Sequence, residues 1–168
     1  MCSSDLVAVT VPFEAFVKKQ AMADAIVNIV LAGGINYALS RNMEAVPLVL
    51  PFGNTAPNLC GTILSTSVLM SILLTIIVFP ITVAQRKSGK VDPGLPADTR
   101  YAGVMWRLVA KHLLFTLPPA IGLSVLAGMV APNLNFSPPV FAALTVIIAA
   151  TMAWFMSQST TRGTMRLG

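Results

Sequence analysis

The chain has 168 residues, of which 55 % are hydrophobic and only 10 % charged, and its net charge is +5. Soluble domains carry about 25 % charged residues, and disordered chains are poor in apolar residues, so this composition excludes both classes, while two cysteines are too few for a disulfide scaffold. The composition therefore indicates an integral membrane protein, in agreement with the mean hydropathy of +0.78.

Residues 6–17 form an apolar stretch that Pro12 and Glu14 interrupt and that Lys18 and Lys19 follow. Because this stretch is too short to cross a bilayer, we expect a short N-terminal interfacial segment lying on the membrane. A frayed arm is the alternative.

Four later stretches are long and apolar enough to span a bilayer as helices, which requires about 20 residues each. We predict these spans at residues 21–39, 59–83, 112–131 and 138–157. The apolar runs are continuous and do not alternate, which favours helices over barrel strands. The predicted fold is all-α, a four-helix transmembrane bundle that forms a single integral membrane domain over residues 1–168.

The loop after the first span, residues 40–58, contains three prolines that exclude a regular helix. Its apolar stretch 46–53 is expected on the membrane surface, with a re-entrant loop as the alternative. In the loop 85–111, residues 97–111 are expected to begin a helix that runs into the third span. The loop 132–137 is short, so we expect the third and fourth helices to form a tight antiparallel pair.

Positive charge is distributed very unevenly between the two sides of the predicted bundle. Four spans put both termini and the loop 85–111 on one side, which holds ten of the eleven Lys and Arg residues, whereas Arg41 stands alone on the other. The positive-inside rule then places both termini in the cytoplasm and makes the protein a multi-pass protein of the inner membrane. We expect the basic side to contact anionic lipid headgroups and not nucleic acid, because no aromatic residues interleave with the charges.

A polar stripe runs along the first predicted helix, where Asp24, Asn28, Ala32 and Asn36 recur every four residues. Ionisable groups at membrane depth are costly and mark candidate functional sites, so we expect Asp24, Asn28 and Asn36 to line a path for a substrate or ion. Two alternatives stay open. The stripe could hydrogen-bond to other helices, and Asp24 could be solvated near the helix start or cap it.

Glycine and proline pairs mark two further places of interest. Gly33 and Gly34 lie beside the polar stripe and are expected to allow either close helix packing or a hinge. Pro118 and Pro119 are expected to kink the third helix or to make it restart. The later spans carry small residues at a spacing of four, which favours close packing in lipid: Ser67, Ser71 and Thr75; Ala120, Ser124 and Gly128; Thr145, Ala149, Ala153 and Ser157.

The sequence offers no catalytic grouping, no metal-ligand spacing and no phosphate-binding loop. We therefore expect no enzyme, no metal and no cofactor. His112 is the only histidine, and beside Lys111 it is expected to be a solvated residue of the interface, with a proton relay as the alternative.

The stretch from residue 25 to residue 48 resembles the opening of small bacterial inner-membrane proteins called permease-like, through Asn28, Asn36, Tyr37 and the sequence Val-Pro-Leu at 46–48. The resemblance implies transport. We expect a small permease-like protein that moves a small solute or ion along a polar path on the first helix, working as a homo-oligomer. The alternative is a non-catalytic accessory or assembly subunit of a larger membrane-protein partner.

Overall fold

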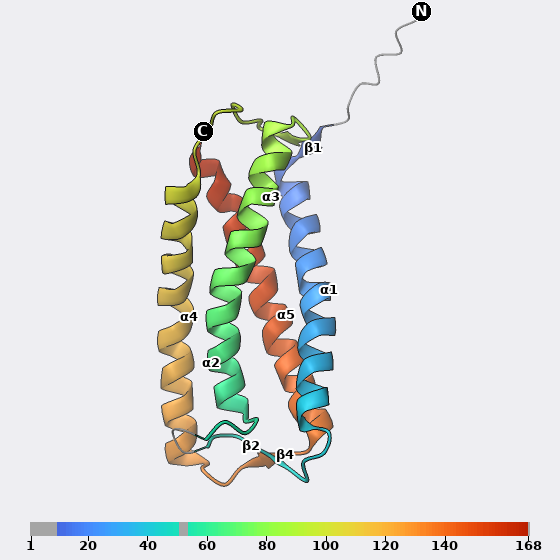
Figure 1. Cartoon of the computed structure of the whole chain (residues 1–168), viewed down its shortest axis with the longest axis vertical. Coiled ribbons are helices and arrows are strands. Elements are labelled where there is room, and N and C mark those ends of the chain that lie inside the picture. The colour runs from blue at the N-terminus through green and yellow to red at the C-terminus, as the bar shows by residue number, and fades with distance from the viewer. Residues whose placement is uncertain (1–9, 51–53, 168) are drawn as a thin grey trace, which may run out of the picture.

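The computed structural model describes residues 10–50 and 54–167. Four long helical segments run up and down the molecule (Figure 1), and each is long and apolar enough to cross a membrane. They are α1 (Phe13–Ser40); α2 (Leu59–Leu69), a π-helical turn η1 (Met70–Leu74) and α3 (Thr75–Lys87) in one continuous rod; α4 (Ala102–Val130); and α5 (Pro138–Gly163), which ends in the 3-10 turn η2 (Thr164–Leu167). The all-α four-helix bundle of a multi-pass membrane protein is thereby confirmed.

Short two-residue ladders tie the segments together at each end. At one end, β1 (Val11–Pro12) pairs in parallel with β3 (Val91–Asp92); at the other, β2 (Val46–Pro47) pairs antiparallel with β4 (Asn135–Phe136). The first end also carries η2 and the loop between α3 and α4, both of which contain basic residues, so we call it the basic end. We call the second the opposite end (Figure 1). Both ends of the described chain therefore lie on the same side, as an even number of spans requires.

Helix α1 is longer than predicted, because it begins at Phe13 and not at residue 21. The expectation of a separate interfacial segment is therefore wrong for residues 13–17, which form the first turns of α1, while residues 6–9 lie outside the described residues. The reason is that Phe13 and Val17 are buried against Val91 of β3, so protein and not lipid covers this apolar face. At 1.5 Å per residue the 28-residue helix is about 42 Å long, which exceeds the roughly 30 Å hydrocarbon core.

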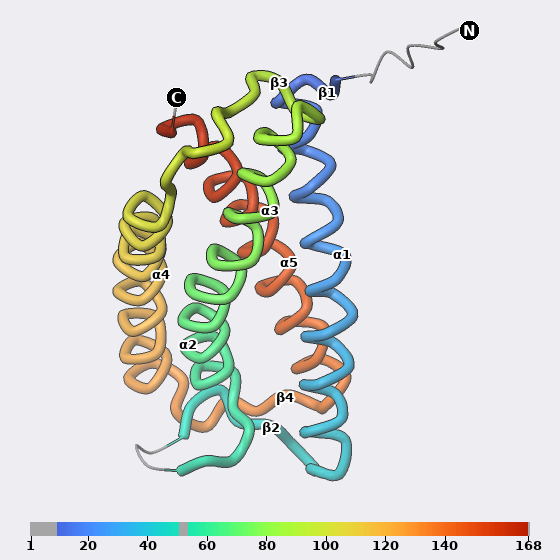
Figure 2. The backbone as a smooth tube through the Cα atoms, turned by 45° about the horizontal axis from the view of Figure 1, so that its top comes forward, coloured from blue at the N-terminus to red at the C-terminus, as the bar shows by residue number. Residues whose placement is uncertain are grey.

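The pairing of the helices differs from the prediction. Helix α5 packs mainly on α1, and α4 packs mainly on α2, so the expected tight pair of the third and fourth helices is wrong. Figure 2 shows α4 at one edge and α5 leaning along α1. The β2–β4 ladder explains the change, since it attaches the start of α5 to the loop that follows α1, where Val46, Leu59 and Phe141 form one buried cluster.

Small residues at a spacing of four fill the helix contacts on two of the spans. The side chains of Thr145, Ala149, Ala153 and Ser157 on α5 are all buried, as are those of Ser67, Ser71 and Thr75. This confirms both predicted seams. On α4 only Ala120 is buried, and Ser124 and Gly128 are half-buried. Close packing of this kind is what holds helices together in lipid, where no hydrophobic effect drives their association.

The third predicted span does not restart at its proline pair, and a break in α geometry lies in the second span. Helix α4 continues without interruption through Pro118 and Pro119, both of them exposed, so the expected restart is wrong. Membrane helices tolerate proline where the freed carbonyls find other partners or local adjustment. The departure from α geometry occurs instead at η1 in the second span, before Pro80.

In the predicted loop 40–58, Val46–Pro47 forms strand β2 and is not helical, as the prolines there predict. Residues 51–53 of this loop lie outside the described residues. Helix α2 then begins with an Asn58 cap, whose Oδ1 accepts a hydrogen bond of 2.7 Å from Gly61 N. Farther along, α4 begins at Ala102, which confirms that a helix from the loop 85–111 runs into the third span.

Candidate functional site

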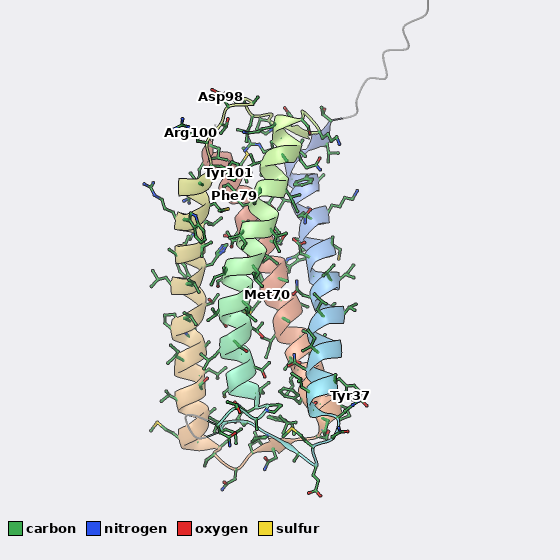
Figure 3. All side chains as sticks on the ribbon, viewed as in Figure 1. Tyr37, Met70, Phe79, Asp98, Arg100 and Tyr101 are labelled. Atoms are coloured by element: carbon green, nitrogen blue, oxygen red, sulfur yellow. The ribbon has the colours of Figure 1, made fainter. Side chains whose placement is uncertain are left out.

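A groove of about 860 Å³ separates α1 from the rod formed by α2, η1 and α3. Helix α5 lies behind it and is visible between the two walls in Figure 1, and Ala149 of α5 reaches its floor. Met70, labelled at mid-height in Figure 3, lines it from η1. The groove exists because α1 packs on α5 and scarcely on the second span within the described chain.

The polar stripe of α1 faces this groove. Asp24, Asn28, Ala32 and Asn36 all line it, and each is half-buried. The structure thus brings the three predicted path residues together along one wall. Hydroxyl groups face them from the second span, and amide and hydroxyl groups border the groove at the opposite end: Thr62, Ser65 and Thr66; Asn54, Thr55 and Asn58.

The two asparagines direct their amide donors back to their own helix. Asn28 Nδ2 donates to the Asp24 carbonyl at 2.8 Å, and Asn36 Nδ2 donates to the Ala32 carbonyl at 2.9 Å. Among the residues that the structure describes, no donor reaches the Oδ1 atom of either asparagine. Each side chain therefore keeps an unused acceptor beside the groove, because an amide oxygen can accept two hydrogen bonds.

Asp24 lies three turns inside α1 and does not cap it, since the helix begins at Phe13. The capping interpretation is therefore wrong. The Asp24 carboxylate accepts hydrogen bonds from Gln20 Nε2 at 3.0 Å and from the Ser157 hydroxyl of α5. It is also the one charged side chain among the described residues that line the groove.

The two glycines of α1 have different surroundings. A Cβ placed on Gly33 would lie 2.9 Å from Val146 Cγ2 of α5, whereas one on Gly34 would meet nothing within 4 Å. Gly33 therefore permits the close approach of α1 and α5, and the helix is continuous across both residues.

A second polar cluster joins the second span, α4 and α5. Thr75 Oγ1 and His112 Nδ1 are 2.9 Å apart, His112 Nε2 and Ser159 Oγ are 3.0 Å apart, and Ser71 and Thr116 share a hydrogen bond of 3.1 Å. We call these five residues the junction cluster. The expectation that His112 is solvated is wrong, because its side chain is buried. The π-helical turn contributes Ser71 and leads directly into Thr75.

Arg86 organises the basic end, a role that its local sequence does not reveal. The residue is only 2 % exposed. Its Nε donates to the Pro93 carbonyl at 2.8 Å, its Nη1 donates to the Thr164 carbonyl at 2.6 Å, and its guanidinium lies 5.7 Å from the centre of the Phe13 ring. One side chain thus joins α3, the following loop, η2 and the start of α1. In the sequence, Arg86 is one of ten basic residues on that side, and nothing near it distinguishes it from the others.

No family model, no curated protein and no solved structure matches this chain. Within residues 10–50 and 54–167, no three His, Cys, Asp or Glu side chains gather in a way that could hold a metal ion. The groove combines apolar walls, unused hydrogen-bond acceptors and one carboxylate, which are features of sites that bind small molecules.

Proposed function

We propose that this membrane protein is a small permease-like protein that moves a small solute along the groove between α1 and the second span. One observation supports the proposal above the others: Asp24, Asn28 and Asn36 line a single groove with unused hydrogen-bond acceptors. Its volume of about 860 Å³ falls within the 300–1,000 Å³ typical of small-molecule sites.

The chemistry of the groove favours one class of solute. Most of its lining is apolar, its free polar atoms include acceptors, and its one formal charge is negative. A carboxylate at membrane depth is stabilised by a positive partner. The solute that fits is therefore small and amphipathic, with an apolar body and an amine or another cationic donor directed at Asp24.

We propose further that both termini are cytoplasmic and that the membrane is the inner membrane, on the basis of the ten basic residues at one end. In that orientation the groove reaches the outer surface beside Asn54–Asn58 and extends inward to Asp24. Transport then requires the inner part to open. Separation of α1 from the second span is the simplest motion, because the two scarcely touch.

A binding and uptake assay tests the proposal. The protein is reconstituted into liposomes and offered dansylcadaverine, an apolar fluorophore with a primary amine, alongside uncharged dansylamide. We expect saturable binding and uptake of the amine and much weaker binding of the amide. Asn28→Leu and Asn36→Leu should abolish flux and leave insertion intact, whereas Tyr37→Leu, outside the groove (Figure 3), should behave as wild type.

Two alanine-to-leucine substitutions test whether the open space of the groove is needed, because they add volume without changing its polar residues. Ala32→Leu fills it at mid-length, while Ala38→Leu adds the same volume to an exposed position of α1. The proposal requires loss of uptake in the first variant only. Normal uptake by Ala32→Leu and by both asparagine variants would show that the groove is not the path.

The unused acceptors also support a second candidate, an accessory subunit whose groove takes a polar residue from a helix of a larger partner. The native mass of the gently extracted protein distinguishes the two functions. A homo-oligomer without other proteins favours transport. A stable complex with a different protein, lost in Asn28→Leu and Asn36→Leu, favours the accessory role.

A further inference from the structure

A second, smaller cavity lies at the basic end, between α4 and the end of α5. Its volume is about 180 Å³, and it is lined by Val104, Arg107, Leu108, Lys111, Gly163 and Arg166. It is below the roughly 300 Å³ of sites for drug-sized molecules, so it suits an ion or a headgroup. It shares no lining residue with the groove.

Three of the lining residues are cations that come from two sides of the cavity. Arg107 and Lys111 are one helical turn apart on α4 and so share a face, and Arg166 faces them from η2. In the described chain the one ion pair joins Arg162 to Glu14, and none of the three cations has a carboxylate within 4.0 Å. Like charges gathered in this way repel one another, and an anion between them relieves the repulsion.

The walls of the cavity are fixed by tight packing beneath the charges. Gly163 is buried, and a Cβ placed on it would lie only 2.7 Å from Leu108 Cδ2. Glycine thus lets the end of α5 approach α4, which carries Arg166 toward Arg107 and Lys111. The fold thus sets the backbone positions of the three cations, whose side chains are exposed.

The depth of the cavity indicates the source of the anion. Lys111 Nζ lies 5.8 Å from the centre of the Phe115 ring, one turn farther along α4, and that ring is 67 % exposed on the face of a membrane-spanning helix. The cationic groups therefore stand where the apolar span meets its basic end, at headgroup depth. Basic pockets between membrane helices at this depth bind lipid phosphates.

We infer that Arg107, Lys111 and Arg166 form a site for a phosphate group, and that its source is the headgroup of an anionic phospholipid. The bound lipid would hold the end of α5 against α4. Lipid binding at this site does not require transport, so an experiment that refutes one proposal leaves the other in place.

Thermal unfolding of the full chain in neutral detergent tests the inference. The midpoint is measured while phosphatidylglycerol, phosphatidylcholine or inorganic phosphate is added. We expect saturable stabilisation by phosphatidylglycerol and none by the other two at the same concentrations. Arg107→Gln/Lys111→Gln should weaken the apparent affinity for phosphatidylglycerol by about tenfold or more, since each cation near the surface contributes about 1 kcal/mol.

The matched control is Lys90→Gln/Arg100→Gln, which removes the same charge from exposed residues of the same end, outside the cavity. Figure 3 shows Arg100 in the loop before α4. This control should keep wild-type affinity, while Arg166→Gln, from the other wall, should weaken it. Equal losses in both double variants, or equal stabilisation by phosphatidylcholine, would overturn the site in favour of diffuse attraction. Equal stabilisation by inorganic phosphate would overturn its assignment to lipid.

Discussion

The groove and the junction cluster are both polar regions inside the bundle, yet the asparagines of the groove and the histidine of the cluster form different kinds of hydrogen bond. In the junction cluster, His112 joins Thr75 of the second span to Ser159 of α5, so its bonds cross between helices. In the groove, Asn28 and Asn36 donate to carbonyls of their own helix. Where no water is present, bonds between helices hold the bundle together, whereas bonds within one helix leave capacity for a ligand.

The same contrast distinguishes contacts that side-chain hydrogen bonds reinforce from contacts that depend mainly on close packing. Arg86 and the junction cluster join the second span to α5, the junction cluster also joins it to α4, and α1 meets the others mainly through α5. In the described chain, the side-chain hydrogen bonds between α1 and α5 are those of Asp24 with Ser157 and of Glu14 with Arg162. Substitutions of Arg86 and of the junction cluster should therefore reduce stability, and substitutions in the groove should reduce function.

The largest effect is expected at Arg86. Arg86→Met leaves the Pro93 and Thr164 carbonyls without their charged donor, and hydrogen bonds to charged groups contribute roughly 1.5–3 kcal/mol each. We expect the free energy of unfolding to fall by roughly 3 kcal/mol or more, measured by thermal unfolding in detergent. Arg86→Lys should recover little of the lost free energy of unfolding, because an ammonium group cannot reproduce the planar, forked donor geometry of the guanidinium.

Arg100→Met is the control for Arg86, because Arg100 is exposed at the same end. It should leave the unfolding midpoint unchanged. If the two variants were equally stable, the basic end would not depend on the buried guanidinium.

His112 should give the next largest effect. His112→Leu removes two bonds between helices, and such bonds in membrane proteins contribute about 0.6 kcal/mol on average and up to about 1.7. We expect a loss of about 1–2 kcal/mol in the free energy of unfolding. A double-mutant cycle with Thr75→Val isolates the pair, and additive single effects would contradict the coupling across helices.

The adjacent glycines of α1 should respond with opposite signs. Gly33→Ala brings a methyl group within 2.9 Å of the stiff Val146 side chain, and overpacking of this kind costs about 1–3 kcal/mol. Gly34→Ala meets open space and should stabilise α1 by about 0.5–1 kcal/mol through the loss of glycine flexibility. Equal shifts of the unfolding midpoint would show that α1 and α5 are not packed closely in solution.

The sequence was sufficient to predict the spans, because continuous apolar runs need no knowledge of the partners. It was not sufficient to predict which helices pair. The short loop 132–137 suggested neighbouring helices, whereas the β2–β4 ladder, a contact between residues far apart in the chain, directs α5 to α1. The predicted start of α1 is also wrong, since burial of Phe13 against Val91 depends on the same kind of distant contact, whereas the predicted starts of α2 and α5 are confirmed.

The candidate site shows a similar division. The spacing of Asp24, Asn28 and Asn36 predicted a shared face, because helical periodicity is local. That the face borders an open groove, and that His112 is buried, depends on how α1, α4 and α5 are arranged. Arg86 could not be singled out, because nothing in its local sequence separates a buried hydrogen-bonding arginine from a solvated one.

The smallest effect on stability is expected at the groove, although the effect on function should be large there. Asn28→Leu and Asn36→Leu remove amides that bond only to their own helix, and the Asp24 and Ala32 carbonyls keep the backbone donors of the residues four positions later. No buried group loses its sole partner, so the free energy of unfolding should change by less than about 0.5 kcal/mol, measured as for Arg86. A loss above about 1 kcal/mol would mean that these side chains hold the bundle together, and the contrast between groove and junction cluster would fail. Unchanged stability together with lost uptake of dansylcadaverine would instead assign the asparagines to the ligand, since only a bound molecule is left to use their free oxygens.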